Sequence, residues 1–163
     1  MSDKSDLVRL LQARSIRRGD FVLASGARSS YYIDARLTTM SAEGLAVIGR
    51  LGLNAIRYAE WDVSAVGGLT MGADPVAYAI AAASVGQGAG QIDAFSVRKE
   101  VKEHGTGRRI EGNFSAGARV VVVEDVITSG GSARKAAESV VAEGGEVVGI
   151  IAVVDREEGG RAV

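Results

Sequence analysis

The sequence contains no cysteine, one histidine and one proline. Without cysteine, the chain cannot form disulfide bonds, iron–sulfur clusters, thiolate zinc sites or a thiol nucleophile. A single histidine excludes a metal site built from several imidazoles. No apolar run approaches the ~20 residues that cross a bilayer, and residues 1–6 are too polar for a secretory signal. We therefore expect a cytoplasmic protein that does not bind membranes.

The sequence also lacks an excess of charge of either sign. The 19 Lys and Arg residues nearly balance the 20 Asp and Glu residues, giving a formal net charge of −1. Such a balance does not favour nucleic-acid binding by the chain as a whole. The 163 residues, 47% of them hydrophobic, suit one globular domain with its own core. The 22 glycines indicate many tight turns, some of which can approach a ligand closely.

Helical and strand patterns alternate along the chain. We expect helices over residues 3–13, 41–59 and 132–143, and a further helix that begins with Pro75 as its first residue. We expect strands within residues 21–34 and at 63–66, 92–97, 120–123 and 147–154. The four consecutive valines of 120–123 suit a central strand of a parallel sheet, apolar on both faces. The sequence therefore predicts an α/β fold with a mainly parallel sheet flanked by helices. Residues 99–112 are polar and glycine-punctuated, which predicts a long mobile loop.

The valine strand leads into a segment that predicts a phosphate-binding turn. Thr128, Ser129 and Ser132 supply three hydroxyl groups, and Gly130 and Gly131 let the backbone come close to a ligand. Successive backbone N–H groups and the N-terminus of the following helix favour an anion there. No lysine follows the glycines, so this is not a Walker A loop.

Two acidic residues precede this turn and need a separate explanation. Glu124 and Asp125 would repel a bare phosphate. They make sense if the ligand also presents neutral hydroxyls or a metal ion. A ribose phosphate does so, because its 2′,3′-diol is set apart from its 5′-phosphate.

The order of strand, acids, hydroxyls, glycines and helix closely resembles the ribose-phosphate signature of the type I phosphoribosyltransferases. Two further segments resemble the orotate phosphoribosyltransferase family: residues 21–36 its N-terminal hood, and residues 97–105 the start of its catalytic loop. Residues 155–159 are similar to its segment after the last of these core strands. The resemblance covers nearly the whole chain. It implies a single type I phosphoribosyltransferase-like domain over 1–163, with a hood and N-terminal helix in 1–38, a core in 39–163 and the mobile loop at about 99–112.

The resemblance also implies the reaction and the residues that carry it. The family transfers a phosphoribosyl group from phosphoribosyl pyrophosphate to orotate with Mg²⁺, which is held mainly by substrate oxygens, and works as a homodimer whose loop residues serve the partner's site. Catalytic roles fall to Lys102, His104 and Asp125. Orotate would contact Thr128, Arg156 and the backbone near Tyr32 and Ile33. Phosphoribosyl pyrophosphate would contact Arg98, Lys99, Lys102, His104, Glu124, Asp125, Val126, Ile127, Thr128, Ser129, Gly130, Gly131 and Ser132.

The chain departs from the family pattern at two positions and at its end. Many members carry lysine where this chain has Ala24 and Met71, so those two contacts are not carried over. Thr70 and Met71 can still line the site through backbone groups. Members usually continue beyond the position of Val163 through a further strand and helix; a naturally short chain and an incomplete sequence both fit. We expect the core chemistry to survive, because every matched residue precedes Val163.

Three alternatives stay open at this stage: a transferase for another base such as a purine, a regulatory protein that binds RNA or a nucleotide, and a binding-only relative. The hood segment argues against a purine. The balanced charge argues against RNA. The basic residues Arg98, Lys102 and His104 favour catalysis over binding alone.

Overall fold

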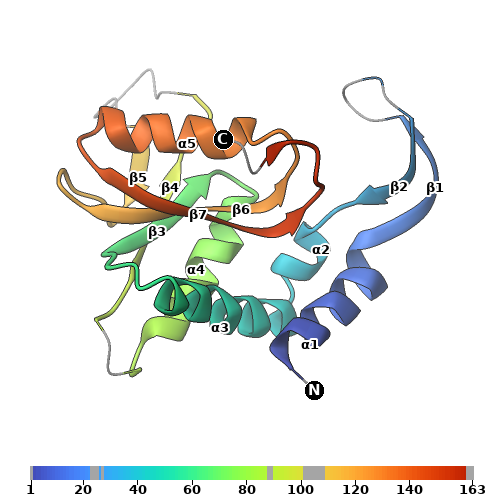
Figure 1. The fold of residues 1–163 in the computed structure, drawn as a ribbon, viewed down its shortest axis with the longest axis horizontal. Helices are drawn as coiled ribbons and strands as arrows, with labels where there is room; N and C mark the ends of the chain where they lie inside the picture. The colour runs from blue at the N-terminus through green and yellow to red at the C-terminus, as the bar shows by residue number, and fades with distance from the viewer. Residues whose placement is uncertain (1, 23–25, 27, 88–89, 101–108, 161–163) are drawn as a thin grey trace.

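A five-stranded sheet lies at the centre of the computed structural model, which describes residues 2–22, 26, 28–87, 90–100 and 109–160. The strands lie in the order β5-β4-β3-β6-β7 (Figure 1). Four of them are parallel, and β5 pairs antiparallel with β4. Their bounds are β3 Ala65–Leu69, β4 Asp93–Val97, β5 Ile110–Gly112, β6 Arg119–Ile127 and β7 Glu146–Asp155. The predicted α/β fold with a mainly parallel sheet is confirmed.

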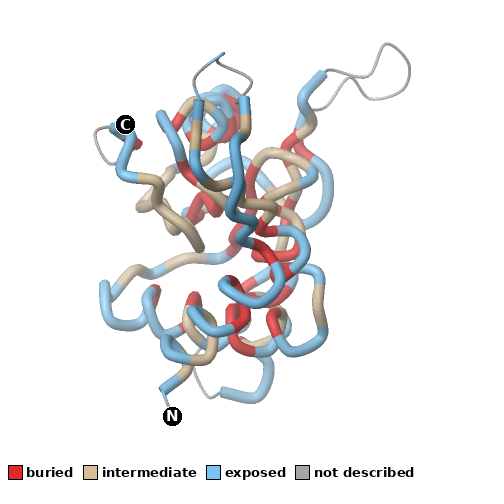
Figure 2. The backbone as a smooth tube through the Cα atoms, turned by 90° about the vertical axis from the view of Figure 1, so that its right-hand side faces the viewer, coloured by how far each residue is buried: buried red, intermediate tan, exposed pale blue. Residues whose placement is uncertain are grey.

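Helices cover both faces of this sheet. Helices α3 (Ala42–Tyr58) and α4 (Ala73–Ser84) pack on one face, and α5 (Gly131–Ala142) packs on the other (Figure 1). The valine run of β6 supplies both cores: Val121 and Val123 face α3 and α4, whereas Val120 and Val122 face α5. Figure 2 shows the buried residues concentrated between these layers. Burial on both faces is the reason that the run does not alternate with polar residues.

The N-terminal segment packs against α3 and ends in a two-stranded ribbon beside the sheet. Helix α1 (Asp3–Leu10) continues as a π-helix, Leu11–Ser15, and leads into β1 (Ile16–Val22), which pairs antiparallel with β2 (Arg28–Ile33) (Figure 1). A short helix, α2 (Arg36–Thr39), follows. The hydroxyl groups of Ser15 and Thr38 share a buried hydrogen bond of 2.7 Å, which ties the base of this ribbon to α2. We refer to β1 and β2 as the hood.

The strand order creates a crevice at the carboxyl ends of the parallel strands. The chain runs from β3 through α4 to β4 on one side, and from β6 through α5 to β7 on the other. Because the two connections leave on opposite faces, the carboxyl ends of the adjacent strands β3 and β6 are not covered by either helix. Ligands of open α/β sheets bind at such a switch point.

The structure differs from the sequence-based expectations at several element boundaries. Residues 110–112, expected in the mobile loop, form β5. This short strand pairs with the side of β4 that β3 leaves free, and it satisfies the backbone hydrogen-bonding groups there. Strand β1 begins at Ile16 rather than Phe21, and β6 runs past Val123 to Ile127. Strand β3, expected at 63–66, continues through Gly67 and Gly68 to Leu69, because it pairs with β4 over that length. Pro75 is the third residue of α4, not the first, which costs no hydrogen bond because first-turn N–H groups have no helical partner.

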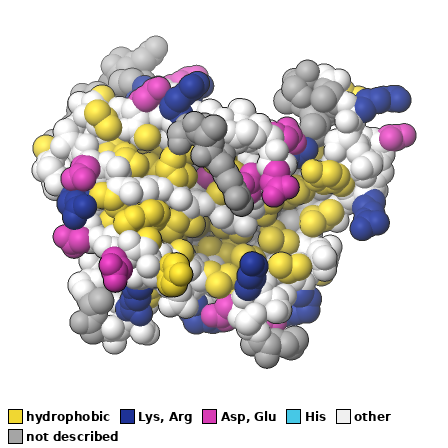
Figure 3. Space-filling view, in the orientation of Figure 1, with side chains coloured by type: hydrophobic (Ala, Val, Ile, Leu, Met, Phe, Trp, Pro, Cys, Tyr) yellow, Lys and Arg dark blue, Asp and Glu magenta, His cyan; other side chains and the backbone are white. Residues whose placement is uncertain are grey.

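Strand β7 lies at an edge of the sheet in the described part of the chain, and residues 147–155 are half-buried. An apolar hollow of about 210 Å³ lies where β7 meets α3 and α4; it is lined by Leu7, Ile48, Leu51, Gly52, Ala55, Val76, Ile80, Ile151, Ala152 and Val153. Figure 3 shows hydrophobic side chains spread across the middle of this face of the molecule. None of the helices formed by the described residues has the length and apolarity needed to cross a membrane.

Candidate active site

A cavity of about 290 Å³ opens at the carboxyl end of β6. The crevice between β3 and β6 therefore contains a real hollow, and the predicted turn surrounds it. Its lining consists of Leu69, Glu124, Val126, Ile127, Thr128, Ser129, Gly130, Gly131, Ser132 and Lys135. Eight of the ten are residues that the sequence had singled out.

The turn between β6 and α5 has the geometry of an anion cradle. Gly130 is the N-cap of α5 and adopts a left-handed conformation with φ of 80°, which glycine reaches without steric cost. Thr128, Ser129 and Ser132 are exposed, so their hydroxyl groups are accessible to a ligand. The first backbone N–H groups of a helix have no helical partner and carry partial positive charge. The turn can therefore hold a phosphate through backbone and hydroxyl donors together.

Two cations near the site were missed by the sequence reasoning. Lys135 lies on α5 one turn after Ser132 and lines the cavity; the three-residue helical spacing was the available signal. Arg36 of α2 pairs with Asp34, which holds the pKa of the Arg36 guanidinium above its ordinary value, with a smaller contribution from the charge of Asp125. No local signal linked Arg36 to Asp125, because the chain fold alone brings them within electrostatic range.

Glu124 is a buried carboxyl group inside the cavity wall. Its side chain is almost fully enclosed, at 6% exposure, and Oε2 has no hydrogen-bond partner. Burial and, to a smaller extent, the adjacent charge of Asp125 together raise the pKa of Glu124 to about 8, while Lys99 acts in the opposite direction. An unsatisfied buried oxygen costs free energy. A ligand that presents hydroxyl groups here would recover that cost.

Asp125 points to the neighbouring β3–α4 turn rather than away from the sheet. Its Oδ1 accepts a hydrogen bond of 2.8 Å from the backbone N–H of Val126. A Cβ atom placed on Gly72 would lie only 2.6 Å from the same oxygen, so the turn passes directly against this carboxylate. Glycine at position 72 is what permits that approach. The acidic pair therefore joins the cradle on one side to the β3–α4 turn on the other.

The stability of the protein should fall as pH rises, because Glu124 has to ionise while buried. Its pKa is raised in the folded state, so between pH 4.5 and 8 the folded protein holds a proton that the unfolded chain has lost. After allowance for screening by water in the cavity, we expect the free energy of unfolding to drop by about 2 kcal/mol from pH 5 to pH 8.5. Urea titrations followed by circular dichroism measure this drop.

Glu124→Gln is the matched control for that measurement, since glutamine keeps the shape and cannot ionise. The variant should lose most of the pH dependence over the same range. An identical pH profile in both proteins would show that another group causes the change.

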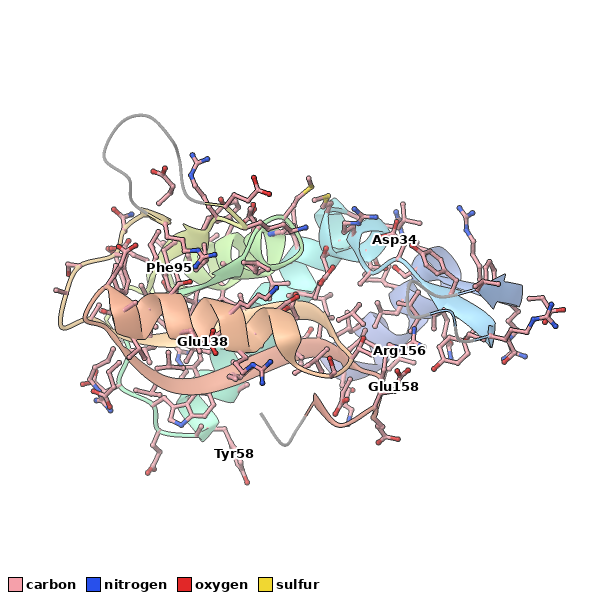
Figure 4. All side chains as sticks on the ribbon, turned by 90° about the horizontal axis from the view of Figure 1, so that it is seen from above. Asp34, Tyr58, Phe95, Glu138, Arg156 and Glu158 are labelled. Carbon is pink, nitrogen blue, oxygen red and sulfur yellow. The ribbon has the colours of Figure 1, made fainter. Side chains whose placement is uncertain are left out.

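Arg156 is held at the junction between the core and the hood. Its backbone N–H donates to the carbonyl of Ile127 (3.0 Å), its Nε donates to Glu158 (2.8 Å), and its guanidinium lies 5.2 Å from the centre of the Tyr31 ring. The side chain is only 10% exposed. Figure 4 shows Arg156 beside Glu158, in the segment after β7 that faces the hood. The structure thus brings the backbone of Arg156 to Ile127 at the end of β6, the residue that precedes Thr128.

The hood residues divide between its two faces. Tyr32, one of the predicted contacts, is exposed and packs against Phe21 at 5.7 Å between ring centres. Tyr31, which the sequence reasoning gave no role, contacts Arg156 instead. Alternate residues of a strand face opposite sides, so Ile33 shares the side of Tyr31. The side chain of Tyr32 does not join Arg156, and only its backbone can take the predicted role.

The predicted cations of the loop lie partly within the described residues. Arg98 directly follows β4 and pairs with Glu111 of β5, with 2.9 Å between Nε and Oε1. Lys99 is exposed, and its charge reaches Glu124. Lys102 and His104 lie outside the described residues, as does Ala24. Arg98 and Lys99 thus lie at the same end of the parallel strands as the acidic pair. The predicted roles of Lys102 and His104 rest on the sequence.

Comparison with known proteins gives consistent matches. The family model of the phosphoribosyl transferase domain matches residues 40–163. The chain is 46% identical over 164 residues to an orotate phosphoribosyltransferase of Aquifex aeolicus, covering 99% of this chain and 88% of that protein. Crystal structures of the Mycobacterium tuberculosis H37Rv orotate phosphoribosyltransferase are similar too. The complex with Fe(III) dicitrate has a TM-score of 0.84 at 46% identity and covers 97% and 87% of the two chains. The complex with phosphoribosyl pyrophosphate has 0.81 at 42%, covering 98% and 87%.

Proposed function

This chain belongs to the orotate phosphoribosyltransferases, within the phosphoribosyl transferase domain family, and we propose from that membership how its residues perform the reaction. It is a pentosyltransferase of pyrimidine biosynthesis that transfers the phosphoribosyl group of phosphoribosyl pyrophosphate to orotate. The products are orotidine 5′-monophosphate and pyrophosphate. The observation that carries the assignment of residues is the cavity in which an anion cradle adjoins the buried carboxyl group of Glu124, with Asp125 next to it in the chain.

The donor substrate is held at both ends of its ribose. Its 5′-phosphate accepts hydrogen bonds from the backbone N–H groups of residues 128–132 and from the exposed hydroxyls of Thr128, Ser129 and Ser132. The ribose hydroxyls donate to Glu124 and Asp125. The negatively charged phosphate thus meets hydrogen-bond donors, and the neutral ribose hydroxyls meet the two acids, which is the arrangement that electrostatics favours.

Orotate binds between the core and the hood. Its carboxylate pairs with the guanidinium of Arg156, whose planar fork matches two carboxylate oxygens. Thr128 and the hood backbone at Tyr32 and Ile33 complete the contacts with the ring. The near-complete burial of the Arg156 side chain strengthens such a pair, because water competes less for its donors.

The chemical step is displacement at C1′ of the ribose. A ring nitrogen of orotate loses its proton to solvent and forms a bond to C1′ as the pyrophosphate oxygen leaves, through an oxocarbenium-like state that needs no protein nucleophile. The chain contributes by orienting the two substrates, excluding water and stabilising charge. Arg98, Lys99 and Lys102 neutralise the leaving pyrophosphate, and His104 donates a proton or a hydrogen bond to it.

Mg²⁺ fits this site as a companion of the substrate. The ion prefers six oxygen ligands, and Glu124 and Asp125 can provide carboxylate oxygens, one of which has no partner in the structure. The remaining ligands would come from pyrophosphate, ribose and water. When bound, Mg²⁺ neutralises charge on the leaving group.

We further propose a cytoplasmic homodimer of single-domain chains, in which the segment that joins β4 to β5, residues 98–109, serves the partner's site. Exposed apolar side chains support an association surface: Leu37 of α2, Met71 before α4 and Tyr78 within α4 are each more than 40% exposed. Met and Tyr are among the residue types that are enriched at protein interfaces. Sedimentation equilibrium at micromolar protein would show a mass of twice 16.8 kDa, whereas a monomer at all concentrations would contradict the proposal.

The activity itself is tested by mixing the protein with phosphoribosyl pyrophosphate, Mg²⁺ and orotate and following the absorbance of orotate. Turnover with orotate and none with adenine or hypoxanthine is expected. Turnover with a purine alone would overturn the choice of base. No turnover with any base would favour a binding or regulatory role.

Lys102→Ala is expected to lower kcat by about a hundredfold, because removal of one group that stabilises transition-state charge costs about this much. The Kd for phosphoribosyl pyrophosphate should change by less than about threefold, since the pyrophosphate keeps its other cations. Steady-state kinetics and titration calorimetry separate the two quantities. Lys4→Ala, which removes an exposed lysine from α1, is the control. Equal losses in kcat and in affinity would contradict a role confined to the leaving group.

A further inference from the structure

A chain of side-chain hydrogen bonds links α4 to the carboxyl ends of β3 and β4. The carboxylate of Asp74, in the first turn of α4, accepts from the hydroxyl of Thr70 (2.5 Å) and from that of Ser96 (2.7 Å). The hydroxyl groups of Ser96 and Tyr78 are 3.1 Å apart. Because the Ser96 proton is directed to Asp74, Tyr78 is the donor in that last bond. The order of donation is therefore Tyr78 to Ser96 to Asp74, with Thr70 donating to the same carboxylate.

This network surrounds the β3–α4 turn that lies against Asp125. Thr70 begins the turn, and its backbone N–H donates to the carbonyl of Val97 (2.9 Å), the last residue of β4. Gly72, within the turn, is the residue whose Cβ would meet Asp125. Asp74 thus fixes three things at once: the turn, the end of β4, and the point from which Arg98 leaves the sheet.

The β3–α4 turn lies on the side of Asp125 away from the cradle, and this position determines which end of the donor substrate it would contact. A ribose phosphate that places its 5′-phosphate in the cradle and its hydroxyls on the acids extends past Asp125, away from the cradle. The group attached to C1′ then lies toward the β3–α4 turn and the residues after β4, where Arg98 and Lys99 begin the basic segment. The backbone of the turn can bind that group only while the turn keeps its shape.

We propose that Asp74 is a positioning residue for the pyrophosphate end of the donor substrate, acting through Thr70 and Ser96 and not by contact with the ligand. The proposal rests on the proposed function for the orientation of the ligand. Two hydroxyl groups converging on one carboxylate restrict the turn more than either bond alone, because a charged acceptor strengthens both bonds. A preorganised turn binds an anion with less loss of conformational entropy.

The test compares two ligands that differ only in the group on C1′. Titration calorimetry gives the Kd of phosphoribosyl pyrophosphate with Mg²⁺ and the Kd of ribose 5-phosphate for each variant. We expect Asp74→Ala to weaken phosphoribosyl pyrophosphate at least tenfold and ribose 5-phosphate less than twofold. Asp74→Asn should restore part of the loss, since an amide still bonds both hydroxyls, once as acceptor and once as donor.

Two further variants keep the proposal testable if Asp74→Ala fails to fold. Ser96→Ala and Thr70→Val each remove one hydroxyl without touching α4, and each is expected to weaken phosphoribosyl pyrophosphate about threefold at unchanged affinity for ribose 5-phosphate. Tyr78→Phe removes only the outermost donor and should have the smallest effect.

The outcomes are distinct from those that test the activity. Equal weakening of both ligands would mean that Asp74 acts only on the stability of the fold, and no change in either would remove it from the site; both results overturn the proposal. A wild-type protein that binds neither ligand would overturn it as well. Selective weakening in a protein that does not convert orotate would sustain the role of Asp74 while refuting the proposed function.

Discussion

Arg156→Met is expected to raise the KM for orotate by about a hundredfold while leaving the Kd for phosphoribosyl pyrophosphate within about twofold, since a charge-assisted pair contributes about 1.5–3 kcal/mol. The loss falls on one substrate because Arg156 lies at the junction with the hood, between Tyr31 and Glu158. The donor substrate is held at the cradle and the acids. Initial rates at saturating phosphoribosyl pyrophosphate, with orotate varied, measure the change.

Two variants make that result specific. Arg156→Lys keeps the positive charge but loses the planar fork, so the KM for orotate should rise by about tenfold, between the wild type and the methionine variant. Arg134→Met removes an exposed arginine of α5 that pairs loosely with Glu138 at 3.9 Å, and it should leave both substrates unaffected. A methionine variant with an unchanged KM for orotate would show that another cation recognises the carboxylate.

Asp125→Asn is expected to weaken phosphoribosyl pyrophosphate by about thirtyfold, which corresponds to about 2 kcal/mol and to the loss of a charged acceptor for the ribose hydroxyls. Asparagine keeps the shape of the side chain and its contact with Gly72, but one oxygen becomes a donor. The fold should therefore persist while affinity falls. Titration calorimetry with the donor substrate and Mg²⁺ gives the ratio directly.

The matched control for Asp125 is another aspartate of the same sheet. Asp93 lies at the first position of β4, at the opposite end of the parallel strands from the site, and is exposed. Asp93→Asn removes the same charge and should not alter binding beyond about twofold. Unchanged affinity in Asp125→Asn, or an equal loss in both variants, would remove Asp125 from the ribose site.

Much of the fold could be predicted because the local signals agree with the tertiary structure. Ser41 stands at the start of the helix expected over 41–59, and it caps α3, with its Oγ accepting from the N–H of Gly44 at 3.1 Å. The valines of β6 indicated a strand buried on both faces, and it lies between two helical layers. The boundary errors arose where pairing with another segment extends or creates a strand. Ile110–Gly112 has no strand pattern of its own and is a strand because β4 lies beside it.

The sequence predicted the contiguous part of the site but not the contacts between residues that are distant in the chain. The cradle is one continuous segment, so the sequence shows its hydroxyls, glycines and acids in order. The hydroxyls, the glycines and Glu124 line the cavity, whereas Asp125 lies against Gly72 of the β3–α4 turn. Tyr31 against Arg156 and Asp74 against Ser96 join residues far apart in the chain. Tyr31 and Tyr32 are adjacent and alike, and only the side of β2 that meets the core distinguishes them.

The sequence by itself determined the family, the fold class and the phosphate-binding turn, because each of these is written in contiguous residues whose chemistry does not depend on distant contacts. The tertiary structure decided that Leu69 of β3 and Lys135 of α5 line the same cavity as that turn, and that Arg156 meets Tyr31 of the hood. It also decided that Glu124 is buried with an unpaired oxygen, and hence that its pKa is raised. Burial and convergence are properties of the packed chain, since both depend on which distant segments exclude water from a given residue.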